Sequence, residues 1–253
     1  MKKIYSVSLL AAAIAVMMFI LPVQASQTDE QIVSSVQQSH VFKTYLKDDD
    51  VNVRSKDGVV SLTGTVSEES HKQLAHETVA GQPGVKSVDN KLEIKGESPA
   101  ENSDAWLMMK VKTSLLFHSS VSGFATEVDV KDGIATLGGE ADSQAQKDLT
   151  TEYAKDIDGV KEVKNEMTVA KAPKKSDGKT MGEQIDDASI TALAKSTLLY
   201  HRSTSGINTK VTTSDGVVTL SGKAKNEAEK DLAAKRVSDV SGVKKVVNNM
   251  TVQ

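Results

Sequence analysis

The chain contains no cysteine and few aromatic residues. None of its 253 residues is Cys, and 4% are Phe, Trp or Tyr. The lack of cysteine excludes disulfides, thiolate metal ligands, cysteine nucleophiles and lipid attachment through an N-terminal cysteine. So few aromatic rings cannot form a surface on which single-stranded nucleic acid stacks. The formal net charge of −3 also argues against a globally basic, nucleic-acid-binding protein.

Motifs for catalysis, cofactors and metals are also missing from the sequence. It contains no Gly-rich phosphate loop, nucleophile elbow or metalloprotease helix. His118 and His201 stand at equivalent positions just past two predicted helices, where an imidazole favours the helix dipole. The acidic run 48–50 lacks the spacing of an EF-hand and is predicted to be a solvated loop. We therefore predict a non-enzymatic protein without a cofactor or a metal.

The N-terminus has the pattern of a secretory signal peptide. Lys2 and Lys3 precede an uncharged apolar stretch at 4–23, and small residues at Val23 and Ala25 suit cleavage after Ala25. The alternative is a retained membrane helix, since about 20 apolar residues can span a bilayer. We expect residues 1–25 to be removed and the remainder to be exported and soluble.

The rest of the chain repeats one unit three times. We predict domains at 27–95, 103–170 and 187–253, with linkers at 96–102 and 171–186. The recurring residues are an Asp-Gly pair, a later Gly and an Asn. They are Asp57, Gly58, Gly64 and Asn90 in the first unit, Asp132, Gly133, Gly139 and Asn165 in the second, and Asp215, Gly216, Gly222 and Asn248 in the third.

Each unit reads as a helix, two strands, a helix and a strand. The Asp-Gly pair between β-forming runs predicts a type I′ hairpin. The opening Asp29, Asp104 and Asp187 are interpreted as helix N-caps. The later glycines are expected at a bulge or a close backbone approach, and the asparagines in structural hydrogen bonds on a buried strand face. The fold class is α+β, with a small mixed three-stranded sheet and two helices on one face in each unit.

This pattern resembles the BON domain. The resemblance rests on Asp-Gly-(Val/Ile)-(Val/Ala)-(Ser/Thr)-Leu-x-Gly, a helix, and Gly-Val-x-x-Val-x-Asn, present in all three units. It implies an αββαβ fold and a non-enzymatic periplasmic protein of osmotic and envelope stress. It also implies binding to phospholipid or assistance to other envelope proteins.

Charge is distributed unevenly among the three units. The first carries −3, the second −5 and the third +4. A cationic end on an acidic protein suits an anionic membrane surface, although ordinary solubility charge explains it equally. The candidate lipid contacts in the third unit are Lys195, Arg202, Lys210, Lys244 and Lys245.

The first helices supply a second candidate surface. At 100° per residue, Trp106, Met109 and Leu116 point away from the helix face that builds the domain core, and Leu199 repeats this weakly. Exposed Trp, Met and Leu suit a lipid or protein contact. Packing between the three units explains them equally.

Two functions therefore remain open. The first is peripheral, reversible binding to anionic phospholipid. The second is a holdase-like chaperone or protein-binding module for exported proteins, which uses exposed apolar patches. Neither involves nucleic acid or metal, and the sequence leaves the oligomeric state open.

Overall fold

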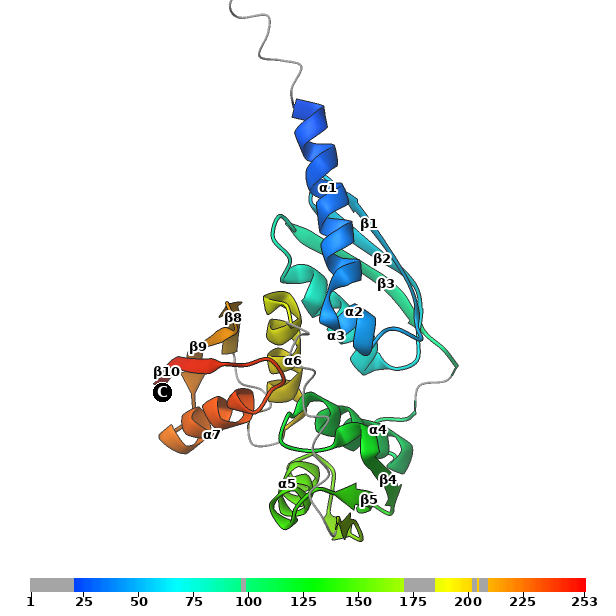
Figure 1. Cartoon of the computed structure of the whole chain (residues 1–253), viewed down its shortest axis with the longest axis vertical. Coiled ribbons are helices and arrows are strands. Elements are labelled where there is room, and N and C mark those ends of the chain that lie inside the picture. Colours follow the sequence, from blue (N-terminus) through cyan, green and yellow to red (C-terminus); the bar gives the residue numbers. More distant parts are fainter. Residues whose placement is uncertain (1–20, 97–98, 171–184, 202–203, 205–208) are drawn as a thin grey trace, which may run out of the picture.

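Three α+β domains follow one another along the chain and pack together (Figure 1). The computed structural model describes residues 21–96, 99–170, 185–201, 204 and 209–253. The first 20 residues of the expected signal peptide, most of the linker 171–186, and Arg202 lie outside the described residues. No helix in the described part is long and apolar enough to span a membrane.

The domains repeat the same order of elements. Domain 1 comprises α1 (Leu21–Gln38), α2 (His40–Thr44), β1 (Asp50–Lys56), β2 (Val59–Val66), α3 (Glu69–Ala80) and β3 (Ser87–Ile94). Domain 2 comprises α4 (Asp104–Phe117), β4 (Thr126–Lys131), β5 (Ile134–Ala141), α5 (Gln144–Lys155), β6 (Glu162–Asn165) and β7 (Thr168–Val169), with a short 3-10 turn at Gly123–Ala125. Domain 3 comprises α6 (Asp187–Tyr200), β8 (Thr209–Ser214), β9 (Val217–Ala224), α7 (Glu227–Ser238) and β10 (Lys245–Val252).

Each sheet is mixed, as the sequence predicts. The middle strand pairs antiparallel with the first strand and parallel with the last, in the orders β1-β2-β3, β4-β5-β6 and β8-β9-β10. In domain 2 the last strand is split, and both β6 and β7 pair with β5. In the described part of the chain, the helices pack on one face of each sheet, and the strand residues of the other face, here called the open face, are the more exposed ones.

The Asp-Gly hairpin turns have the predicted geometry. Asp57, Asp132 and Asp215 have φ values of 55°, 55° and 52°, and the glycines that follow them have φ values of 76° to 81°. Positive φ at both central residues defines a type I′ turn. The later glycine also matches its prediction, because a Cβ added at Gly64 would lie 2.0 Å from the carbonyl oxygen of Asp50.

The opening aspartates are not the N-caps that the sequence suggested. The N-caps of α4 and α6 are Ser103 and Asp186, one residue earlier. Asp104 instead accepts hydrogen bonds from the backbone N–H groups of Asp132 and Gly133, at 2.8 and 2.9 Å. Asp29 and Asp187 bind the turns of domains 1 and 3 in the same way. This carboxylate therefore fastens the first helix to the hairpin.

The repeated asparagine fastens the second helix to the last strand. The Asn165 amide donates to the carbonyl of Lys147 on α5 at 2.8 Å, and its oxygen accepts from the backbone N–H of Met167 at 3.0 Å. Asn90 and Asn248 make the equivalent pair of bonds in domains 1 and 3. Both polar ends of each asparagine side chain are therefore used within its own domain.

Replacing Asn248 with alanine is expected to destabilise domain 3. The substitution leaves the Lys230 carbonyl and the Met250 N–H without their partner. The expected loss is about 1–3 kcal/mol of unfolding free energy, measured by chemical denaturation with circular dichroism. The neighbouring Asn249→Ala, on an exposed residue, is the matched control and should stay within about 0.5 kcal/mol of the parent. Equal effects of the two substitutions would contradict the assigned role.

Asp104→Asn is expected to loosen the 132–133 turn at neutral pH. Hydrogen bonds from Asp132 and Gly133 hold the pKa of Asp104 below its ordinary value of 3.8. Its contribution is therefore present above that value and is lost as the pH falls through the lowered pKa. Amide exchange at the turn should be faster in the variant at pH 7, and the two proteins should converge in strong acid. Asp129→Asn, on an exposed strand residue, is the control that should exchange like the parent.

Candidate functional site

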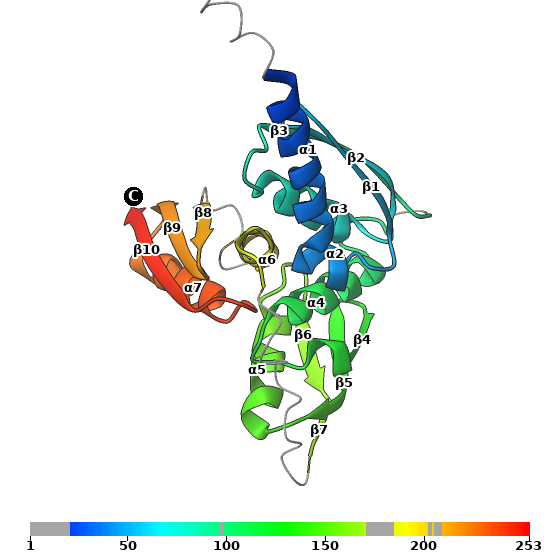
Figure 2. The ribbon, with the colours of Figure 1, turned by 45° about the horizontal axis from the view of Figure 1, so that its top comes forward.

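Helices of the three domains meet at one junction. Figure 2 shows α6, viewed nearly along its axis, between the sheet of domain 3 and the helices of domain 1. Tyr45 from domain 1 packs edge-on against Phe117 of α4, with ring centroids 5.7 Å apart. Phe117 in turn stacks on Tyr200 of α6 at 6.5 Å. Each domain thus contributes one ring, and burial raises the pKa of Tyr45 to about 12.

Domain 3 contacts domain 1 mainly through α6 and α3. All of α6 is buried except Asp187, Lys195 and Leu199. The N-cap Asp186 also accepts a 2.8 Å hydrogen bond from the backbone N–H of His40. Lys195 donates to Glu77 of α3 at 2.6 Å. These contacts fix the start of α6 against domain 1.

Domain 3 contacts domain 2 through two histidines that are buried and face each other. His118 follows α4 and His201 follows α6, and their side chains are fully buried. Their Nε2 atoms lie 3.1 Å apart. Each Nδ1 faces a carboxylate of the other domain, with 3.5 Å from His118 to Asp239 and 3.2 Å from His201 to Asp156. The arrangement has an approximate twofold relation between the domains.

Further hydrogen bonds complete the seam around the histidines. Arg236 of α7 reaches Asp156 at 2.9 Å and lies over the ring of Tyr153 at 4.6 Å. Tyr153 and Ser120 both donate to Asp239. Backbone pairing joins the same segments, with antiparallel bridges between His118 and Val240 and between Ile157 and His201.

Burial is the largest influence on both imidazoles. It lowers the pKa of His201 to about 4, and the facing Asp156 opposes this only in part. Burial also lowers the pKa of His118 against the opposing effect of Asp239. Burial would raise the pKa of Asp239, but the bonds from His118, Ser120 and Tyr153 hold it below its ordinary value.

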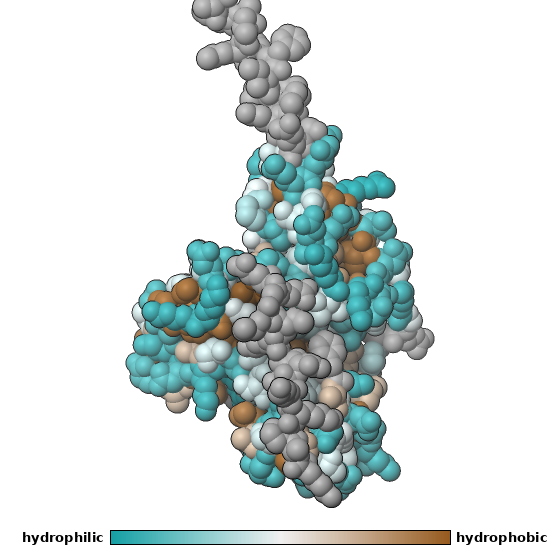
Figure 3. All heavy atoms as spheres, in the orientation of Figure 1, coloured by the Kyte–Doolittle hydropathy of each residue, from teal (hydrophilic) through white to brown (hydrophobic). Residues whose placement is uncertain are grey.

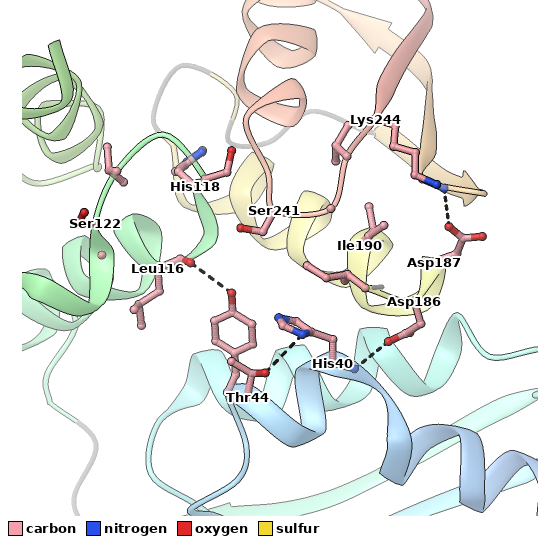
Figure 4. A pocket seen from close by; sticks show the side chains of 18 of the residues that line it. His40, Thr44, Leu116, His118, Ser122, Asp186, Asp187, Ile190, Ser241 and Lys244 are labelled. Atoms are coloured by element: carbon pink, nitrogen blue, oxygen red, sulfur yellow. Dashed lines mark hydrogen bonds between the residues drawn. The ribbon is translucent and has the colours of Figure 1, made fainter. Parts of the chain in front are cut away.

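A cavity of about 1040 Å³ opens beside this junction and is lined by all three domains. Figure 4 shows His40 and Thr44 on one side, Leu116 and His118 on another, and Ile190 and Lys244 opposite them. Tyr45 spans the gap with a 3.2 Å hydrogen bond to the carbonyl of Leu116. The lining is mixed, with apolar side chains and both signs of charge.

The predicted apolar patch on the first helices is largely covered. Trp106, Met109 and Leu116 are all half-buried rather than exposed. The Lys110 ammonium lies 3.7 Å from the centroid of the Trp106 ring, and Leu116 lines the cavity. Of the four residues, only Leu199 is open to solvent, with 47% of its surface exposed. Three of the four residues are therefore partly covered, and Trp106 and Leu116 pack against the core that domains 1 and 2 share.

The predicted basic residues divide into two groups. Lys195 is engaged with Glu77 and is not a free cation. Lys210, Lys244 and Lys245 are exposed, although the ammonium of Lys244 donates to the carbonyl of Asp215 at 3.1 Å. Arg202 lies outside the described residues.

The open face of the domain 3 sheet carries one sign of charge. The alternation of buried and exposed residues puts Lys210, Lys223 and Lys245 on this face, among Ser, Thr, Val and Asn. Its strand residues include no carboxylate on that face.

The equivalent face of domain 2 carries four carboxylates and two lysines. They are Glu127, Asp129, Glu140, Glu162, Lys131 and Lys164. The open sheet faces therefore carry about half of the charge difference between the two domains. Figure 3 also shows brown, apolar residues over the strands of domain 3.

The sequence interpretation missed the histidine seam. His118 and His201 do end their helices as expected, but each is buried against the other domain. One signal was available. Asp156 and Asp239 are equivalent residues of the two repeats, whereas domain 1 has Lys43 and Gly81 in place of the His and the Asp. Among the described residues, no cluster of three or more His, Asp or Glu is placed to hold a metal ion.

Curated proteins that resemble this chain in sequence include an osmotically inducible protein and an outer-membrane lipoprotein. The Osmotically-inducible protein Y of Escherichia coli (strain K12) is 32% identical over 143 residues, which cover 55% of this chain and 71% of that protein. The Outer membrane lipoprotein DolP of Haemophilus influenzae is 29% identical over 164 residues, 65% of this chain and 74% of that protein.

Solved structures add little. The CdsD protein of the Type III secretion system of Chlamydia trachomatis aligns over 88% of this chain and 91% of its own, but with 15% identity and a TM-score of 0.23. That score is too low to support an inference. The family comparison is more informative, since the BON domain model matches residues 28–96, 103–171 and 186–253. With this match over most of its length, the chain belongs to the BON domain family and carries three copies of the domain.

Proposed function

We propose that this protein is a non-enzymatic, periplasmic envelope-stress protein that binds anionic phospholipid surfaces peripherally. The observation that carries the proposal is the open face of the domain 3 sheet, with Lys210, Lys223 and Lys245 and no carboxylate from its strands. Three lysines on one face can approach a flat anionic surface together. Each basic residue near such a surface adds about 1 kcal/mol.

Membership of the BON family and the two named relatives support an envelope and osmotic-stress role. The contact surface differs in part from the one that the sequence suggested. Lys210 and Lys245 were already candidate contacts and are kept, and Lys223 is added. Lys195 and Trp106 are left out, because Lys195 is paired within the protein and Trp106 is half-buried. Leu199 stays a candidate apolar contact at the exposed side of α6.

Replacing Lys210, Lys223 and Lys245 together with Gln is expected to weaken binding to anionic vesicles by on the order of 100-fold or more, since each lysine adds about 1 kcal/mol. Co-sedimentation with vesicles of phosphatidylglycerol and phosphatidylethanolamine measures this. Binding of the parent should fall steeply with added salt, because screening weakens exposed charge contacts. The parent protein should not co-sediment with zwitterionic vesicles.

The matched control neutralises Arg54, Lys56 and Lys91, which occupy the open sheet face of domain 1. It makes the same change in net charge at a different place. This control should bind nearly as well as the parent. If both triple variants lose vesicle binding equally, or if binding of the parent persists in strong salt, the proposed surface is contradicted.

The cavity at the junction favours a second candidate function, that of a holdase-like module for exported proteins. Its apolar lining from Tyr45, Leu116 and Ile190 suits a short apolar segment of an unfolded chain. This function predicts suppressed aggregation of an unfolded client in the absence of lipid. Leu116→Gln should reduce the suppression, whereas Leu199→Gln, outside the cavity, should not. If the parent protein leaves aggregation of the client unchanged, the holdase function is rejected.

A further inference from the structure

The seam between domains 2 and 3 buries two imidazoles whose protonation is coupled to domain docking. The Nε2 atoms of His118 and His201 are 3.1 Å apart, which is hydrogen-bond distance. One bond between two nitrogens holds one hydrogen. When both rings are protonated, each Nε2 carries a hydrogen, and the two N–H groups point at each other. The docked geometry therefore accommodates one Nε2 hydrogen between the rings but not two.

Among the described residues, the charged groups that face the pair lie near the C-terminal ends of α5 and α7. Asp156 at the end of α5 faces His201, and Asp239 at the end of α7 faces His118. Both carboxylates favour protonated imidazoles. Arg236 of α7 opposes them, because its guanidinium lowers the pKa of both histidines. Tyr153 of α5 stacks on His118 with ring centroids 3.9 Å apart and donates to Asp239. The hydroxyl of Ser114 on α4 lies 3.2 Å from Nε2 of His201.

We propose that the His118–His201 pair is an acid-sensitive latch, which holds domains 2 and 3 together near neutral pH and releases them when both imidazoles are protonated. Domain 1 has Lys43 and Gly81 at the equivalent positions and has no such latch. Release would uncover the ends of α4 and α6, including Phe117 and Tyr200, which are buried in the docked state. The proposal is independent of lipid binding and is tested without vesicles.

The linkage of protonation to docking gives the direction in which docking strength changes with pH. An exposed histidine has a pKa of about 6.5, whereas burial lowers the pKa of His201 to about 4 in the docked state. Docking is therefore at full strength above about pH 6.5 and weakens as the pH falls toward about 4. His201 by itself accounts for about a 30-fold weaker docking equilibrium at pH 5.0 than at pH 7.5.

Distance measurements between the two domains test the latch. Because the chain has no cysteine, Asp129→Cys on β4 and Thr212→Cys on β8 can carry spin labels at exposed strand residues of domains 2 and 3. In the full chain purified after export, dipolar spectroscopy should give one narrow distance distribution at pH 7.5. At pH 5.0 a broad second population should appear. An unchanged distribution between the two pH values would overturn the proposal.

Two variants assign the effect to the pair. His118→Gln with His201→Gln removes both titrating rings and should abolish the change between pH 7.5 and 5.0, whether the seam stays closed or open. His76→Gln, on α3 of domain 1, is the control and should behave as the parent. A pH response that survives the double substitution would reject the latch.

Histidine NMR on the unsubstituted chain provides a measurement that does not depend on how a variant folds. His201 should titrate well below the pH of about 6.5 at which an exposed histidine titrates. If His201 titrates near that pH, the ring is not held in a protonation-sensitive seam, and the proposal fails.

Discussion

The structure depends on one constraint: the first helices of the second and third repeats, α4 and α6, have more apolar surface than their own sheets can cover. The constraint is strongest in α6, where all residues but Asp187, Lys195 and Leu199 are buried. A helix that is apolar on every side must be surrounded. α6 is covered by its own sheet on one side and by α3 and α4 on the others. Domains 1 and 2 consequently share one continuous core, which includes Leu193 and Tyr200 of α6.

Within a domain, most of the structure could be predicted from local residue patterns. The hairpin turns, the strand order and the asparagine bonds follow from positive φ, alternation and buried polarity, which each repeat shows separately. The role of Asp104 could not be predicted, because a carboxylate beside a helix start suits both helix capping and turn binding. Its partner lies 28 residues away, and only the fold brings the two together.

Between domains, the sequence predicted much less. Lys195 and His201 look like surface residues in one repeat, but Lys195 pairs with Glu77 and His201 is buried against His118, both in other repeats. Packing between units was one of two explanations for the apolar helix faces, and the sequence could not choose between them. The charge difference among repeats was visible, but locating the part of it on the open sheet faces required the strand registers. The two sides of the domains thus have different roles: the helices hold the three domains together, and the open sheet faces are turned to the surroundings.

The most direct test of this account is small-angle X-ray scattering of the full chain in dilute solution at neutral pH. The docked arrangement predicts a single conformation, with a scattering profile and a maximum dimension that match the three packed domains. The profile should not change with added salt, since the junction is mainly buried apolar contact. A profile that fits only an ensemble of independently moving domains would contradict the account, because α6 would then be left without the neighbours that cover it.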